Sequence, residues 1–275
     1  MTVLDQASLK DQLAVITGGA GLLGVKHAEA IAEAGGCPVL WDINESAAEE
    51  AAQKISESHG CPALAMTVDI TDPGAVEQAT DRLWRDHGAV RILINNAAND
   101  PKVGPDETAT WSRFENFGRP MWDQDIAIGL TGAFLCSQAI GSRMAVAGKG
   151  VILNVASDLG VIAPDQRLYR KDGVPENEQP VKPVTYSVVK HGLIGLTKYL
   201  ATYWADANVR VNAISPGGVY NGQPDEFVNR LSSLIPLGRM AHQDEYKAAI
   251  VFLCSEMSSY MTGQNLIMDG GRSVI

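Results

Sequence analysis

The stretch Thr17-Gly-Gly-Ala-Gly-Leu-Leu-Gly24 lies between a short apolar run and a segment with helical periodicity. A glycine-rich turn that leaves a buried strand and begins a helix can hold a dinucleotide at the helix N-terminus. Gly18 permits a tight turn, Gly21 lets the backbone approach a pyrophosphate, and Gly24 allows the helix and strand to pack closely. The stretch therefore predicts a strand, turn and helix that together bind a dinucleotide.

The rest of the chain continues this alternation of strand-like and helical segments. The expected strands cover residues 13–17, 39–42, 63–69, 91–95, 150–156, 210–215 and 265–268. The expected helices include residues 23–34, 45–57, 76–87, 126–147 and 186–205. The alternation predicts an α/β fold of Rossmann type, a doubly wound parallel sheet with helices on both faces. The length of 275 residues and the 45% apolar content fit a single domain over residues 1–275.

Asp42 adds a second feature of a nucleotide site. It ends the second expected strand, on the order of 20 residues beyond the turn, where a carboxylate can bind the adenosine ribose diol. Its charge would repel a 2′-phosphate, and the glycine turn contains no Arg or Lys. We therefore expect NAD rather than NADP as the cofactor. A turn without a ligand and an aspartate that only caps the next helix are the structural alternatives.

Tyr186-Ser-Val-Val-Lys190 places a phenol and an ammonium group at positions i and i+4, on one face of the expected helix. A unit charge about 4 Å away is worth roughly 4 kcal/mol at an effective dielectric of ~20. That interaction could bring the tyrosine pKa from ~10 towards 7. The spacing alone occurs on many helices by chance. Together with Ser157 and the glycine turn, however, it indicates hydride transfer on an alcohol or ketone.

These residues resemble the short-chain dehydrogenase/reductase superfamily, in its single-domain branch. The resemblance extends over nearly the whole chain and includes Asp69-Ile70, Asn95-Asn96-Ala97-Ala98, Ser157-Asp-Leu-Gly160, Pro216-Gly217-Gly218 and Met261-Thr-Gly-Gln-Asn-Leu-Ile-Met-Asp-Gly-Gly271. It implies that Ser157 holds the substrate oxygen and that Tyr186 exchanges its proton. It also implies that Lys190 lowers the tyrosine pKa and binds the nicotinamide ribose.

The resemblance further implies where the cofactor lies. Asp69 and Ile70 would border the adenine, Asn96 and Ala97 the adenosine, and Val219 the nicotinamide carboxamide. The full set of expected cofactor contacts is Gly18, Gly21, Leu22, Leu23, Asp42, Asp69, Ile70, Asn96, Ala97, Tyr186, Lys190, Pro216 and Val219.

The chain departs from the family pattern at several positions. The middle glycine of the turn comes one position early, with Leu22 in the later place, and Asn221 stands where a cofactor-touching threonine is common. Gly129 occupies the position that usually holds an asparagine, which anchors a proton-relay water. We expect water or a neighbouring polar group to hold Lys190 instead, because an unpaired buried ammonium would cost several kcal/mol.

Ser157 and Tyr186 are separated by an unusually long insert. We expect residues 161–184 to form a lid over the nicotinamide end of the site, with Arg167, Arg170 or Lys171 meeting an anionic group of the substrate. The alternative is a solvated loop whose own acidic residues neutralise these cations. The stretch at residues 162–169 is similar to members from flagellin and polysaccharide sugar pathways, which suggests a sugar or nucleotide-sugar derivative as substrate.

Composition limits the remaining functions. The net charge of −10 opposes binding to nucleic acid or an anionic membrane, and no apolar run approaches the ~20 residues of a membrane helix. The N-terminus has no signal-peptide pattern, so we expect a cytoplasmic protein. The cysteines at positions 37, 61, 136 and 254 show no metal-ligand or redox spacing, and we expect them to be reduced. No metal site is expected.

Assembly and alternative functions complete the expectations. Gly192 and Gly195 lie on the helix that carries Tyr186, where small residues allow close helix contact. The resemblance implies a homodimer or homotetramer built on this helix and the C-terminal segment, with packing inside one subunit as the alternative. A non-catalytic NAD-binding sensor or assembly protein, and an NADP-linked ketoacyl reductase, are the other functions considered.

Overall fold

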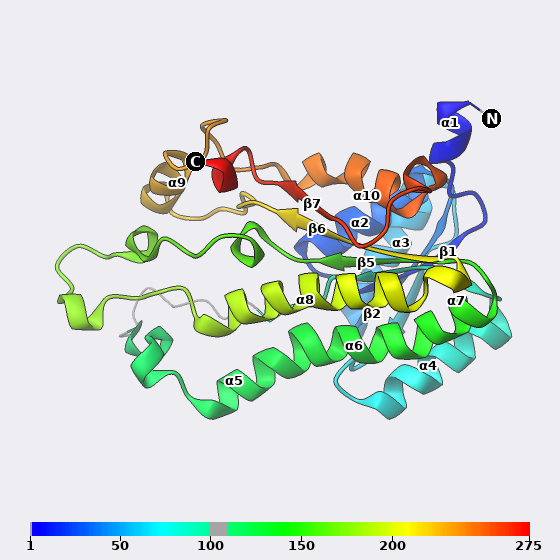
Figure 1. Ribbon diagram of the computed structural model, residues 1–275, viewed down its shortest axis with the longest axis horizontal. Coiled ribbons are helices and arrows are strands. Elements are labelled where there is room, and N and C mark those ends of the chain that lie inside the picture. Colours follow the sequence, from blue (N-terminus) through cyan, green and yellow to red (C-terminus); the bar gives the residue numbers. More distant parts are fainter. Residues whose placement is uncertain (1, 100–108) are drawn as a thin grey trace.

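A seven-stranded parallel sheet forms the centre of the computed structural model, which describes residues 2–99 and 109–275 (Figure 1). The strand order is β3-β2-β1-β4-β5-β6-β7, and every neighbouring pair is parallel. The strands are β1 (Leu13–Thr17), β2 (Cys37–Asp42), β3 (Leu64–Thr67), β4 (Val90–Asn95), β5 (Gly150–Val155), β6 (Val209–Pro216) and β7 (Asn265–Met268). The expected doubly wound Rossmann-type sheet is therefore confirmed, with all seven strands at the expected places.

Helices cover both faces of the sheet (Figure 1). One face packs against α2 (Leu22–Glu33), α3 (Glu45–His59) and α10 (Lys247–Cys254). The other packs against α4 (Pro73–Asp86), the helical run of α6 (Gly132–Cys136) and α7 (Ser142–Val146), and α8 (Val184–Tyr203). The remaining helices are α1 (Val3–Ala7), α5 (Arg119–Ile126) and α9 (Asp225–Ser232). Two apolar cores result, one on each side of the sheet.

The strand order reverses between β1 and β4, because β2 and β3 extend the sheet on one side of β1 and β4 to β7 extend it on the other. In an open parallel sheet this reversal opens a crevice at the carboxyl ends of the strands, where ligands bind. The expected site residues follow these strand ends.

The expected helix over residues 126–147 was wrong in its start and in its regularity. The helical run begins at α5, with Pro120 in the first turn, where proline is well tolerated. Two π-helical stretches, Ala127–Thr131 and Ser137–Gly141, interrupt it. The helices α9 and α10 were not expected from the sequence. α10 is largely apolar and packs against α2. Its sequence therefore lacks the regular spacing of polar and apolar residues that identifies a helix.

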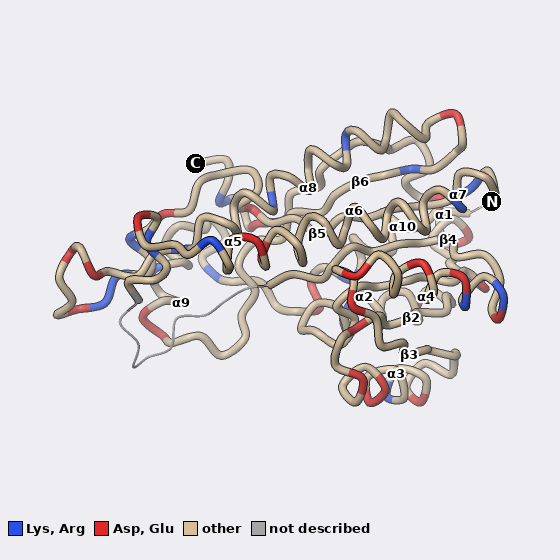
Figure 2. Tube along the Cα trace, turned by 90° about the horizontal axis from the view of Figure 1, so that it is seen from below, with Lys and Arg blue, Asp and Glu red and all other residues tan. Residues whose placement is uncertain are grey.

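The fold places the acidic residues and the four cysteines. Acidic residues recur along α3, where the Cα trace in Figure 2 is red at several places. All four cysteines are free thiols. Burial and the nearby Cys61 raise the pKa of the Cys37 thiol, so these two residues are neighbours without a disulfide. Among the described residues, no helix is long and apolar enough to cross a membrane.

Candidate active site

A cleft of about 830 Å³ lies at the carboxyl edge of the sheet. It brings together residues from the ends of β1, β2, β4, β5 and β6 and from α8. All residues expected to act in catalysis or cofactor binding line it: Gly18, Gly21, Leu22, Leu23, Asp42, Asp69, Ile70, Asn96, Ala97, Ser157, Tyr186, Lys190, Pro216 and Val219. Segments far apart in the sequence therefore meet in one place.

The glycine turn has the geometry that its sequence suggested. Gly18 has φ +59°, and a Cβ at this position would lie 2.9 Å from the Cα of Ala97. A Cβ on Gly24 would lie 2.1 Å from the carbonyl oxygen of Gly18. Gly21 is the N-cap of α2 and provides no side-chain cap. The first N–H groups of α2 are therefore available to an anionic group at the helix N-terminus.

Thr17 and Asn96 fasten the turn to the end of β4. The Thr17 Oγ1 accepts from the backbone N–H groups of Asn96 at 3.0 Å and Ala97 at 3.1 Å. The Asn96 side chain donates back to the carbonyl oxygens of Thr17 at 3.0 Å and Gly18 at 3.1 Å. This positioning role of Thr17 was missed from the sequence, although a threonine ending the strand before the turn is its signal.

Asp42 lies at the end of β2 with its carboxylate held by two backbone N–H groups. Oδ2 accepts from Ala20 and Oδ1 from Asn44, each at 3.0 Å. A shallow depression beside it is lined by Ile43, Asn44, Glu45, Ser46 and Glu49. Asp42 therefore sits in a fixed orientation in an acidic part of the cleft rim.

Tyr186 and Lys190 lie in the first two turns of α8, as their spacing predicted. The Lys190 Nζ lies 5.8 Å from the centroid of the Tyr186 ring and donates to the carbonyl oxygen of Val155 at 2.7 Å. Lys190 is 5% exposed, so its ammonium is largely removed from solvent. A second cation, Lys182, has its Nζ 3.8 Å from the same ring centroid. Lys182 was not expected to take part in the site.

Ser157 follows β5 and is the N-cap of a short helical turn. Its Oγ donates to Asp158 Oδ1 at 2.8 Å and accepts from the Leu159 backbone N–H at 3.2 Å. The other carboxylate oxygen of Asp158 accepts from Arg272 at 2.7 Å. Both Asp158 and Arg272 line the cleft and were missed from the sequence. The Asp that directly follows Ser157 was the available signal, whereas Arg272 had none.

Gly129 lies in the first π-helical stretch and packs against α8. A Cβ at residue 129 would lie 2.5 Å from the Val189 Cγ1, so Val189 occupies the space of a larger side chain. Lys190 has the carbonyl of Val155 as a partner. The Lys190 ammonium thus has a polar partner at the end of β5, whereas the space beside residue 129 is filled by the apolar Val189 and not by the expected polar group.

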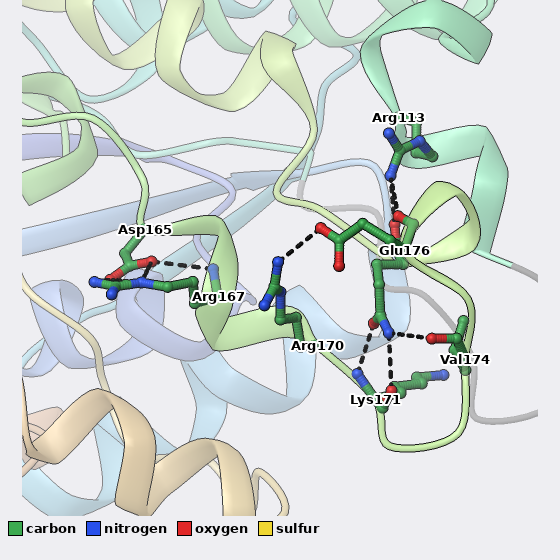
Figure 3. A network of polar contacts seen from close by, with 8 residues as sticks. Arg113, Asp165, Arg167, Arg170, Lys171, Val174 and Glu176 are labelled. Carbon is green, nitrogen blue, oxygen red and sulfur yellow. Dashed lines mark hydrogen bonds and ion pairs between the residues drawn. The ribbon is translucent and has the colours of Figure 1, made fainter.

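The insert at residues 161–184 is tied to itself and to the segment before α5 (Figure 3). The buried Gln179 side chain accepts from the Lys171 N–H at 2.8 Å and donates to the carbonyls of Lys171 at 3.0 Å and Val174 at 2.6 Å. Arg113 donates to the carbonyls of Glu176 at 3.1 Å and Gln179 at 3.4 Å. The insert is therefore a braced loop with its own hydrogen bonds.

Two of the expected anion-binding residues are paired within the insert. Arg167 meets Asp165 at 2.6 Å, and Arg170 meets Glu176 at 2.6 Å. The hydrogen bonds from Arg167 lower the pKa of Asp165 to about 2. Neither these arginines nor Lys171 are among the described residues that line the cleft. This arrangement matches the alternative, in which acidic residues of the loop neutralise its cations.

Other residues of the insert do reach the cleft. Leu168, Tyr169 and Lys182 line it, and Leu168 packs in a cluster with Leu231 of α9. The Tyr169 and Phe227 rings lie 5.8 Å apart. The insert and α9 thus pack against each other and both contribute apolar side chains to the lining of the cleft.

The fold and the cleft define a doubly wound α/β protein with a dinucleotide-type turn and a Tyr/Lys pair at one sheet edge. Residues 12–169 match the family model described as "short chain dehydrogenase", and residues 175–273 match the one described as "Enoyl-(Acyl carrier protein) reductase". The chain belongs to the short-chain dehydrogenase family. It is an oxidoreductase that transfers hydride between a nicotinamide cofactor and an alcohol or ketone.

Three similar proteins illustrate the activities in this family. The chain is 32% identical to the D-threitol dehydrogenase of Mycolicibacterium smegmatis, over 97% of this chain and 94% of that protein. It is 34% identical to the NAD-dependent glycerol dehydrogenase of Listeria innocua, over 97% and 96%. The gluconate 5-dehydrogenase of Burkholderia cenocepacia, solved with NADP and tartrate, has a TM-score of 0.86, 26% identity and full coverage of both chains.

Proposed function

We propose that the protein is an NAD-dependent dehydrogenase that interconverts a secondary alcohol of a small polyol and the corresponding ketone. The observation that carries the proposal is the convergence of Ser157, Tyr186 and Lys190 with the glycine turn on one cleft. The cradle fits a dinucleotide, because a Cβ at Gly18 would collide with Ala97 and the N-terminus of α2 lacks a side-chain cap.

Each catalytic side chain has a separate role in this proposal. The nicotinamide ring, when bound, takes up or supplies the hydride. The Tyr186 phenolate accepts the proton of the substrate hydroxyl during oxidation and returns it during reduction. Lys190 stabilises that phenolate by its nearby positive charge. The Ser157 Oγ lies 2.8 Å from Asp158 Oδ1, and its hydroxyl proton can turn from that carboxylate to donate to the substrate oxygen.

The acidic surroundings of Asp42 support NAD over NADP. The carboxylate is fixed by Ala20 and Asn44, which leaves its oxygens able to accept from a ribose diol. Glu45 and Glu49 line the adjoining depression. A 2′-phosphate placed there would meet like charges without an arginine or lysine from that depression to balance them.

The polar residues beyond Tyr186 support a polyhydroxylated substrate. Asp158, Lys182, Gln223 and Arg272 line the cleft with Ser157, whereas the insert and α9 contribute apolar side chains to its lining. Side chains that donate and side chains that accept hydrogen bonds can together bind several hydroxyl groups. D-threitol and glycerol, named in two relatives, are small polyols. A sugar carries the same kind of hydroxyl groups, whereas a nucleotide sugar would add a charged diphosphate, and the two are tested separately.

An assembly through α8 is also part of the proposal. Tyr199 and Tyr203 are 62% and 65% exposed, and their rings stack 5.7 Å apart. Gly195 has open space where a Cβ would point, whereas a Cβ on Gly192 would meet Leu130 within the same subunit. The exposed end of α8 thus offers an aromatic and small-residue surface to a second copy. We propose a homodimer or homotetramer on this surface.

The experiment is a substrate screen that follows NADH absorbance with purified protein. Panels of small polyols, nucleotide sugars and ketoacyl thioesters are tested with NAD(H) and with NADP(H). The expected result is polyol oxidation with NAD. Preferred turnover of ketoacyl thioesters with NADPH would support the reductase alternative. NAD binding without turnover of any panel would support a non-catalytic sensor.

A further inference from the structure

A small cavity lies behind the Tyr186 and Lys190 pair, between α8 and α5. Its volume is about 10 Å³, and its polar lining consists of Asn99, Asp125, Thr185, Tyr186 and Lys190. A cavity of this size is on the order of a single water molecule, and such a site holds water only where several polar groups surround it. The cavity is separate from the main cleft but shares both members of the catalytic pair with it.

Asp125 is the acidic residue of this cavity. It is 5% exposed and lies in the last turn of α5. Its Oδ1 accepts from the Asn99 side-chain amide at 2.7 Å, and its Oδ2 accepts from the Thr185 hydroxyl. Each carboxylate oxygen has two lone pairs, so a carboxylate held in this way can accept a further hydrogen bond.

Gly129 explains why the polar group comes from residue 125. Position 129 contributes no side chain, and the Val189 Cγ1 lies 2.5 Å from the place where its Cβ would be. Asp125 lies one helical turn earlier on the same run, and residues four apart share a face. Its carboxylate therefore reaches the cavity that a side chain at 129 cannot enter without displacing Val189.

We propose that Asp125 is a positioning residue for Lys190. Its carboxylate holds one water molecule in this cavity against the Lys190 ammonium, and its bond to Thr185 fixes the first turn of α8 just ahead of Tyr186. The inference rests on the proposed roles of Tyr186 and Lys190. The Lys190 ammonium donates to the carbonyl of Val155, and Lys190 lines the cavity together with Asp125.

A positioning role and a simple charge effect have opposite consequences for Tyr186. A buried negative charge disfavours ionisation of a nearby phenol, so its removal alone would make Tyr186 ionise at lower pH. If Asp125 instead keeps the Lys190 ammonium near the phenol, its removal makes Tyr186 ionise at higher pH. The titratable side chains that line or face this cavity from the described elements are Asp125, Tyr186 and Lys190, with Lys182 against the Tyr186 ring.

The test is a spectrophotometric tyrosine titration of the cofactor-free protein. The Tyr186 signal is isolated by subtracting the titration of Tyr186→Phe made in the same background. We expect Asp125→Ala to raise the pH of Tyr186 ionisation by about one unit, which corresponds to about 1.4 kcal/mol. Asp125→Asn keeps the size of the side chain and should raise the pH of Tyr186 ionisation by a smaller amount. A downward shift, or none, in both variants would overturn the proposal.

Two further sets of variants separate the proposal from a folding defect. Asp123→Asn removes an exposed acid from the same helix and should leave the Tyr186 titration unchanged. In the Asp125→Ala background, Gly129→Asn with Val189→Ala places an amide in the cavity. This combination should reverse at least half of the rise in the Tyr186 ionisation pH. Gly129→Ala with Val189→Ala supplies the same space without the amide and should leave the Tyr186 ionisation pH as high as in Asp125→Ala alone. Equal recovery with alanine would also overturn the proposal.

No substrate is needed for these measurements, so a failed substrate screen does not affect them. NADH binding, measured by fluorescence, should change less than threefold in Asp125→Asn, because the residue does not line the main cleft. Turnover on an identified alcohol should fall by about 10- to 100-fold in Asp125→Ala, since a displaced catalytic group can cost up to ~10²-fold.

Discussion

Arg272, close to the C-terminus, forms a 2.7 Å ion pair with Asp158, the residue that directly follows Ser157. Both side chains are buried, at 8% and 4% exposed. Removing one partner of a buried pair leaves an uncompensated charge and typically costs about 3–5 kcal/mol. We therefore expect Arg272→Ala to lower the free energy of unfolding by about that amount in urea titrations of the cofactor-free protein.

A double-mutant cycle provides the control for this pair. Asp158→Ala with Arg272→Ala should cost clearly less than the sum of the two single substitutions, because neither charge is then left alone. Additive costs would show that the two side chains do not stabilise each other.

Asp42 is expected to set the cofactor preference. Asp42→Ala removes the ribose contact and the repulsion of a 2′-phosphate together. It should therefore raise the KM for NAD and bring the kcat/KM values for NAD and NADP closer together. Steady-state kinetics with both cofactors measure the effect. Glu57→Ala, an exposed acid further along α3, is the matched control and should change neither constant. Equal use of NADP by the unmodified protein would refute the assignment.

Tyr186→Phe is expected to separate binding from chemistry. The substitution removes the proton-transferring oxygen and little else, so turnover should fall by a factor on the order of 10² or more. NADH affinity, measured by fluorescence titration, should stay nearly unchanged. Tyr203→Phe on the exposed end of the same helix should retain full turnover. Retained turnover in Tyr186→Phe would assign proton transfer to another group.

The arginines of the insert are expected to contribute little to substrate binding. Arg167 and Arg170 are 76% and 50% exposed and already paired, and exposed pairs are worth about 0–1 kcal/mol. Arg167→Ala and Arg170→Ala should therefore each change the KM for the identified substrate by less than about threefold. Gln179→Ala removes the hydrogen bonds that hold the insert together and should raise the KM for the substrate more than either arginine variant does. A selective loss for an anionic substrate over an uncharged analogue in either arginine variant would restore the anion-binding interpretation.

His27 is expected to make stability depend on pH. It is fully buried in α2, and burial lowers its pKa to about 3. The unfolded chain takes up a proton near pH 6.5, whereas the folded chain does so only near pH 3. Its contribution to stability is therefore fully present above pH 6.5 and is lost as the pH falls towards 3, by up to about 1.4 kcal/mol per pH unit.

The measurement compares urea unfolding at pH 7.5 and pH 5.5 in the unmodified protein and in His27→Leu. The unmodified protein should lose about 1.4 kcal/mol more than the variant over this interval. An identical pH dependence in both proteins would show that His27 gains a proton in the folded state.

The sequence predicts the sheet well because each strand is a short buried run between punctuating residues. Gly18, Asp42 and the Tyr186 and Lys190 pair could be placed because each depends on local spacing along one element. Asp158 and Arg272 meet across more than a hundred residues, and no periodicity relates them. Asp125 and Val189 were missed for the same reason. Their effect on the site arises from packing between two helices, which residue order alone does not specify.

The contact between Gly129 and Val189 also limits how this site can change over time. A larger side chain at 129 collides with Val189 unless residue 189 is first reduced in size. Exchange at the two positions should therefore be coupled, with the smaller residue at 189 arising before the larger residue at 129. Among relatives, we expect the two positions to covary: glycine at 129 with a branched residue at 189, and a polar residue at 129 with a small one at 189.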